Sequence, residues 1–181
     1  MLPWFTLPSW EARMTEPTAH YVIEIIVIGI IATLVTDIWQ RLQAMVGLPP
    51  ARWGLIGRWV AGFPRGVFVH QSIATAASVR GETAIGWAFH YAIGIAWAAL
   101  YVLIVRFGLG SDPTLVSALA VSLALLVAPW FAMQPALGMG FMASRTPKPA
   151  AARAMSVLAH TIFGIGLYLG AIGWAWLTGA A

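Results

Sequence analysis

Four apolar runs of about twenty residues each constrain the fold of this chain more than any other feature. They cover roughly residues 21–39, 85–105, 115–133 and 155–176. A helix needs about 20 apolar residues to cross the hydrocarbon core of a bilayer. Because lipid offers no partner to an unpaired backbone group, each run is expected to be helical. The sequence therefore predicts an all-α, integral membrane four-helix bundle.

The composition agrees with lipid as the main solvent. Hydrophobic residues make up 60% of the 181 residues and charged residues only 9%, whereas soluble domains average about 25% charged residues. The net charge of +4 does not point to nucleic acid, because the arginines gather in the loops between the apolar runs. We expect membrane lipids as partners and no nucleic acid. The chain has no cysteine, which excludes disulfides, thiolate metal sites and cysteine nucleophiles.

The charges of the loops predict the orientation of the chain. The short middle loop has only Arg106 against Asp112, and the other two loops are long and basic. The positive-inside rule places both long loops in the cytoplasm and both termini outside. Residues 1–20 are expected to form an outside N-terminal arm, followed by a single four-helix transmembrane domain over residues 21–181. The basic residues of the two long loops are Arg41, Arg52, Arg58, Arg65 and Arg80 in the first, and Arg145, Lys148 and Arg153 in the second.

The first long loop contains an amphipathic segment, ARWGLIGRWVAGF. Its apolar residues, Trp53, Ile56 and Trp59 among them, fall near one helical face, while Arg52 and Arg58 fall elsewhere. This pattern is typical of an interfacial or re-entrant helix on the cytoplasmic leaflet. An ordinary helix packed within the loop is the alternative.

Two histidines lie inside apolar runs, His90 in FHYAIGIAW and His160 in AHTIFGIGL. Ionisable groups at membrane depth are costly, so they are candidates for function. At about 1.5 Å of rise per residue, both histidines lie about five residues from the cytoplasmic ends of their spans. Asp37, Met133 and Gln134 lie near the same ends of the first and third spans. These five residues form a predicted polar layer and are the candidate ligand-binding residues.

Each histidine stands four residues before a glycine, and this spacing leaves a structural role open. Small residues let helices approach closely in membranes, so each histidine could simply donate a hydrogen bond across a tight helix contact. The shared H-x-x-x-G-I pattern is also compatible with two αα halves related by an axis along the membrane normal. In that arrangement His90 and His160 would face a central axis.

Two further features concern the ends of the spans. Pro135 removes a backbone donor near the cytoplasmic end of the third span, so this helix is expected either to kink or to line a cavity with its freed backbone. Glu24, at the opposite end of the first span, is expected at the outer headgroups. The outer half of the bundle is otherwise almost wholly apolar, which argues against a continuous water-filled pore.

Five motifs make the chain resemble a bacterial family catalogued only as a domain of unknown function. They are G-R-W, P-R-G-x-F-x-H, G-W-x-x-H-Y-x-x-G, M-Q-P-x-x-G-x-G and S-R-T-P-x-P, and the resemblance covers roughly residues 29–173. It implies a small four-span protein of the bacterial inner membrane and supplies no activity. The matching positions are Arg58, Trp59, Arg65, His70, Gly86, Trp87, His90, Tyr91, Met133, Gln134, Pro135, Ser144, Arg145, Thr146 and Pro147.

Three functions fit these residues. The favoured one is binding or translocation of a small polar or ionic ligand at the predicted polar layer. Arg58, Arg65, His70 and Arg145 would then form a cytoplasmic mouth or bind lipid phosphates. The second is a metal or tetrapyrrole site at His90 and His160, with haem, a chlorophyll-type ring or copper as the cofactor. The third is a structural accessory subunit of a larger membrane complex. A homodimer is expected for translocation, because four helices make a thin pathway. No nucleophile elbow, phosphate-binding loop or H-E-x-x-H motif occurs, so a non-enzymatic role is favoured.

Overall fold

The computed structural model describes residues 18–179. This part of the chain contains helices and loops but no strand, and four of its helices are long and apolar enough to cross a membrane. The prediction of an all-α membrane protein is therefore confirmed. The predicted N-terminal arm falls outside the described residues, except that residues 18–20 already belong to the first helix. The spans are α2 (Thr18–Met45), α4 (Glu82–Val102) continued by η2 (Leu103–Gly108), α5 (Leu115–Ala124) continued through η3 (Pro129–Met133) and α6 (Gln134–Ala136), and α7 (Pro149–Thr178).

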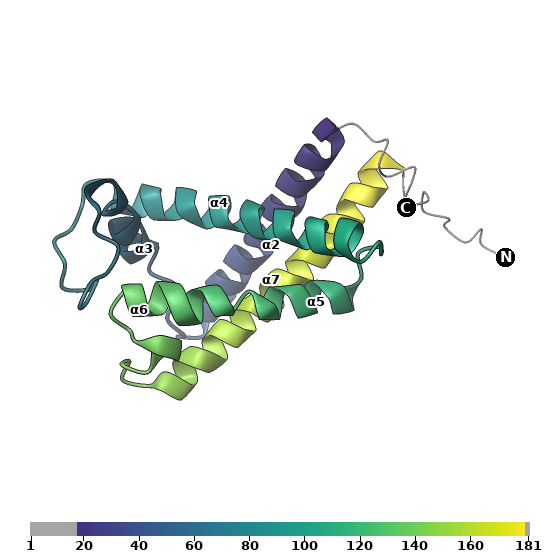
Figure 1. The fold of residues 1–181 in the computed structure, drawn as a ribbon. Helices are drawn as coiled ribbons and strands as arrows, with labels where there is room; N and C mark the ends of the chain where they lie inside the picture. The colour runs from purple at the N-terminus through teal and green to yellow at the C-terminus, as the bar shows by residue number, and fades with distance from the viewer. Residues whose placement is uncertain (1–17, 180–181) are drawn as a thin grey trace.

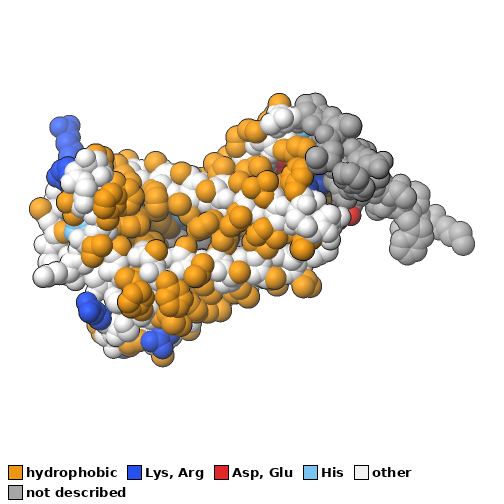
Figure 2. All heavy atoms as spheres, in the orientation of Figure 1, with side chains coloured by type: hydrophobic (Ala, Val, Ile, Leu, Met, Phe, Trp, Pro, Cys, Tyr) orange, Lys and Arg blue, Asp and Glu red, His pale blue; other side chains and the backbone are white. Residues whose placement is uncertain are grey.

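The four spans run antiparallel to their neighbours along the chain, as Figure 1 shows. α2 packs against both α4 and α7, and α7 packs against α5 in turn. The two long loops therefore lie at one end of the spans, which we call the basic end. The short loop 109–114 lies at the other, which we call the far end. In Figure 2 the visible sides of the spans are largely hydrophobic, and most of the visible lysine and arginine side chains lie at the basic end.

α2 has one face toward lipid and one toward protein. Its large exposed side chains recur every four residues, at Val22, Ile26, Ile30, Leu34, Ile38 and Leu42. Glu24, Ile28, Ala32 and Thr36 recur with the same spacing on the opposite side and are buried. This period is the one expected of a helix with a single stripe against its neighbours. Because the exposed stripe is apolar, its natural contact is lipid.

Glycines allow the helices to approach closely. A Cβ at Gly29 would lie 2.6 Å from the Cα of Ile95 in α4, and a Cβ at Gly166 would lie 2.6 Å from the Cα of Ala32 in α2. Gly164 meets α5 in the same way, with Ser122 Cβ at 3.1 Å. Small residues at such crossings let backbones pack directly against each other in membranes. The predicted close contacts after His90 and His160 are present, since Gly94 packs against Thr33 and Gly164 against α5.

Two spans contain π-helical turns, which often mark functional positions. One is η2, at the far end of the second span, and it carries Arg106. The other is η3, which begins at Pro129 and carries Met133, directly before Gln134. The third span is therefore irregular, as predicted from Pro135, but the α-helix is already interrupted by a turn at Leu125 and Leu126, one turn before Pro129, which also lacks a backbone donor.

The first long loop folds over the basic end. Its short helix α3 (Trp53–Val60) packs against the start of α4, where Gly57 meets Glu82 and Gly86 meets Trp53. The loop then reaches the third span, because His70 N donates to the carbonyl of Ala136 and Ile73 N to that of Leu137. Short helices η1 (Phe63–Arg65) and η4 (Phe141–Ala143) complete the two long loops. A helix in the first loop was predicted, and the structure shows that it is packed on the second span.

Candidate functional site

The centre of the candidate site is the carboxylate of Asp37, between α2 and α4 near the basic end. His90 Nε2 donates to Asp37 Oδ1 at 2.9 Å, and the Tyr91 hydroxyl donates to Asp37 Oδ2 at 2.9 Å. Both carboxylate oxygens therefore have a partner from α4. The side chains of Asp37 and His90 are 16% and 13% exposed, so the carboxylate is mostly, though not fully, withdrawn from the surroundings.

Aromatic rings cover His90 on the side of the basic end. The indole of Trp53 stacks on the imidazole with ring centroids 3.8 Å apart and an interplanar angle of 27°. Trp87 lies edge-on to the same imidazole at 5.7 Å and also contacts Trp53 and Tyr91. Because Trp53 is the first residue of α3, this loop helix forms part of the wall of the site. We call Asp37, His90, Tyr91, Trp53 and Trp87 the Asp37 site.

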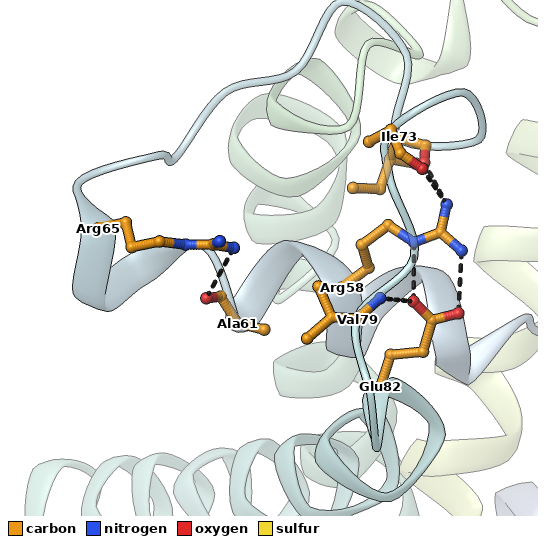
Figure 3. A network of polar contacts seen from close by, with 7 residues as sticks. Arg58, Ala61, Arg65, Ile73, Val79 and Glu82 are labelled. Atoms are coloured by element: carbon orange, nitrogen blue, oxygen red, sulfur yellow. Dashed lines mark hydrogen bonds and ion pairs between the residues drawn. The ribbon is translucent and has the colours of Figure 1, made fainter.

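An ion pair holds α3 in place over the site. Arg58 donates from Nε and Nη2 to the two oxygens of Glu82, the first residue of α4, at 2.8 and 2.9 Å, as Figure 3 shows. Arg58 Nη1 donates to the carbonyls of Ile73 and Ala76, and the backbone N of Val79 donates to Glu82. Two-point pairing of this kind is geometrically specific. The hydrogen bond to Glu82 raises the pKa of Arg58 above its ordinary value.

The predicted mouth residues differ in their surroundings. The guanidinium of Arg58 makes internal contacts that position α3, whereas Arg65 and Arg145 are exposed. Arg65 donates to the carbonyl of Ala61 at the end of α3, as Figure 3 shows. The backbone of His70 bonds to Ala136, and its ring Nε2 is buried without a hydrogen-bond partner among the described residues. Arg65 and Arg145 are thus the two whose side chains are free to meet lipid phosphates.

A second polar group lies between α6 and α7. Gln134 Nε2 donates to Ser156 Oγ at 3.4 Å, and His160 Nδ1 donates to the backbone carbonyl of Ser156 at 3.0 Å. Gln134 is 5% exposed, and its Oε1 has no hydrogen-bond partner in residues 18–179. Ser122 of α5 donates to the carbonyl of His160. Met133 is half-buried at the end of η3, directly before Gln134.

The predicted polar layer therefore forms two groups. Asp37 and His90 form a hydrogen bond in the Asp37 site. Gln134 and His160 both donate to Ser156, on the other side of the contact between α2 and α7. Within residues 18–179 no group of three or more His, Asp or Glu side chains is placed to hold a metal ion.

Several residues that build these groups could not be assigned a role from the sequence. Tyr91 was part of a family motif, but its bond to Asp37 depends on the rotation of α4 about its axis. Trp53 was assigned to an interfacial face, and the structure stacks it on His90. Ser156 had no signal, because an isolated serine near the start of a span is common in loops and helix ends.

Glu24, expected at the outer headgroups, is buried within the protein. Its side chain is 1% exposed, and its Oε1 lies 2.7 Å from Arg106 Nη2. Arg106 belongs to η2, and its side chain turns back into the protein from the end of the second span. The far half of the molecule is therefore not wholly apolar. Two residues of opposite charge near the same membrane boundary are the signal that could have predicted this pair.

A comparison with protein families finds a match over most of the chain. The sequence model of the family described as Protein of unknown function (DUF2938) matches residues 26–173. Neither the curated proteins nor the solved structures contain a significant match. The matched range includes the Asp37 site, the second polar group and Arg106, but it excludes Glu24. The chain belongs to the family described as Protein of unknown function (DUF2938).

Proposed function

We propose that this protein binds or translocates a small polar or ionic ligand at the Asp37 site. The observation that carries the proposal is the Asp37 carboxylate, which lies within a span with both oxygens held by α4. Ionisable side chains in membrane spans are rare and usually mark ligand or ion pathways. The carboxylate needs only one hydrogen bond across the helix contact for packing, and it has two partners from adjacent residues.

The chemistry of the Asp37 site favours a cation, the proton included. Its carboxylate is bonded by His90 and Tyr91, and the rings of Trp53 and Trp87 lie against His90. Aromatic faces attract cations through their quadrupole. His90 lies between the carboxylate and Trp53, so its protonation changes the charge of the site directly. A cation that binds here would replace His90 or Tyr91 as a partner of the carboxylate.

The ligand would enter from the cytoplasm in the orientation that we propose. The positive-inside rule places the basic end in the cytoplasm and both termini outside, in the bacterial inner membrane. This is supported by the arginines and lysine of the two long loops. Reporter fusions test it. Alkaline phosphatase joined after residue 181 should be active, and the same enzyme inserted after Gly47, in the first long loop, should be inactive. The reverse pattern would overturn the orientation.

A flux assay tests the function. The purified protein is reconstituted in liposomes, and the entry of protons, potassium, ammonium and choline is followed with an internal dye or a radiolabel. We expect one of these cations to move faster than through protein-free liposomes, and the same cation to raise the thermal denaturation midpoint of the protein in detergent. Equal flux in both kinds of liposome, with no change of the midpoint, would contradict binding and translocation of these cations at the site.

A further inference from the structure

The far half of the molecule contains a second buried acid that the Asp37 site does not use. Glu24 lies on the protein-facing stripe of α2, beside Ile28, and is fully buried. Its only charged contact at ion-pair distance within residues 18–179 is Arg106, at 2.7 Å. An ionised carboxylate withdrawn from water is costly unless it is paired and hydrogen-bonded. The contacts around Glu24 therefore show whether this pair is complete.

The pair is incomplete. Glu24 Oε2, Arg106 Nε and the Tyr101 hydroxyl are all buried, and none has a hydrogen-bond partner among the described residues. Tyr101 itself is fully buried in the core between α4 and its neighbours. A carboxylate can accept about four hydrogen bonds. Among the described residues Glu24 has an ion-pair contact at Oε1 alone, and neither of its oxygens has a partner with hydrogen-bond geometry. A structural ion pair kept only for stability would be expected to satisfy more of these groups.

The position of Arg106 gives its side chain an alternative location outside the ion pair. It lies in the π-helical turn η2, three residues before the exposed Leu109. Its side chain is already 15% exposed, against 1% for that of Glu24. A long arginine side chain near the end of a span can extend to the headgroups while its stem stays in apolar surroundings. Arg106 can therefore leave the pair without losing its charge, but Glu24 has no comparable route to water.

Among the described residues, the titratable neighbours of Glu24 include no second acid. On α2 itself the neighbour is His20, one turn before Glu24, and on η2 it is Arg106. Tyr101 on α4 interacts with Glu24 and Arg106, and also with Tyr168 on α7. No other carboxylate among these neighbours competes with Glu24 for a proton. When Arg106 moves away, a proton is the remaining partner that removes the charge.

We propose that Glu24 is a proton-binding site at which a proton and Arg106 compete for the same carboxylate. In one state the carboxylate is ionised and paired with Arg106. In the other it has taken up one proton and become a neutral carboxyl group, and the guanidinium, still protonated, lies at the headgroups. The proposal does not depend on which ligand the Asp37 site binds, and it gives the far end a response to proton concentration.

Infrared difference spectroscopy of the reconstituted protein tests the proposal. Lowering the pH should produce the carbonyl stretching band of a protonated carboxyl group. This band should be lost in Glu24→Gln and kept in the matched variant Asp37→Asn, which removes the other acid of α2. Arg106→Gln should show the band already at neutral pH, because a buried carboxylate without its counter-charge takes up a proton. Arg106→Lys keeps the charge and should restore the wild-type behaviour.

Two results of this experiment would contradict the proposal. An acid-induced band that is unchanged in Glu24→Gln, or an Arg106→Gln protein without the band at neutral pH, would overturn the proposal and leave a static ion pair. Glu24→Gln leaves Arg106 buried and unpaired, which can prevent folding. The double variant Glu24→Gln with Arg106→Gln removes both charges together, so it provides the band-free reference if the single variant cannot be purified.

Discussion

Replacement of Gly86 by alanine is expected to destabilise the protein and to release α3 from the second span. A Cβ at Gly86 would collide with the carbonyl oxygen of Trp53, and one at Gly57 would collide with that of Glu82. Both obstacles are backbone atoms, so a side-chain movement cannot relieve them. Overpacking of this kind costs about 1–3 kcal/mol. Trp53 lies over His90, so the change should also open the Asp37 site.

Thermal denaturation in mild detergent and limited tryptic digestion measure this effect. We expect Gly86→Ala and Gly57→Ala to lower the denaturation midpoint and to make Arg58, which is partly buried in the structure, accessible to trypsin. Gly173→Ala is the matched control, because its Cβ would meet only Ile31 Cδ1 at 3.9 Å, an ordinary contact. Alanine is favoured over glycine in a helix by about 1 kcal/mol, so this control should be neutral or slightly stabilising. Equal behaviour of Gly86→Ala and Gly173→Ala would contradict the packing of α3 described above.

The second large effect is expected from Asp37→Asn. Asparagine keeps the shape of the side chain and can still accept from Tyr91, so the helix contact should survive. It removes the negative charge that the proposed cation requires. A hydrogen bond to a charged group contributes about 1.5–3 kcal/mol, which corresponds to a loss of about 10- to 150-fold in affinity. The liposome flux above that of protein-free liposomes should fall by about 5- to 75-fold at ligand concentrations near the wild-type Kd.

Tyr91→Phe is the graded control for this prediction. It removes one hydrogen bond to Asp37 Oδ2 but leaves the carboxylate and the bond from His90. Because Tyr91→Phe keeps the negative charge that the proposed cation requires, any change of affinity should be smaller than that in Asp37→Asn. Asp37→Asn with wild-type flux and affinity would refute the assignment of the ligand to the Asp37 site, even if the protein proved to transport a cation.

The depth of the polar residues could be predicted from the sequence, and their direction around each helix could not. Counting residues from the ends of the spans placed Asp37 and His90 at one level, and they do form a hydrogen bond. The same counting placed His160 at that level, where its ring bonds to the carbonyl of Ser156 on its own helix. The rise per residue fixes height alone. Which neighbour a side chain meets depends on which helices are adjacent, and the four spans could have been arranged in several orders.

The loop contacts could not be predicted from the sequence, for a different reason. The amphipathic pattern around Trp53 and Trp59 predicted a helix in the first loop, and this helix is present. A bilayer surface and the side of another helix present similar apolar surroundings to such a face. The pairing of Arg58 with Glu82, residues 24 positions apart, joins this helix to the second span, and no periodic pattern in the chain indicated that pairing.

The glycine crossings on α2 have a mechanical consequence. The backbone contacts of α2 with α4 and α7 gather at Ile28, Gly29 and Ala32. This point is about midway between Glu24 and Asp37, which lie about 10 Å from it in opposite directions along the helix axis. α2 also contacts α7 near both of its own ends, at His20 and at Gln43. Both acids therefore belong to one helix that is held along its length, and a displacement of that helix would carry the two carboxylates together.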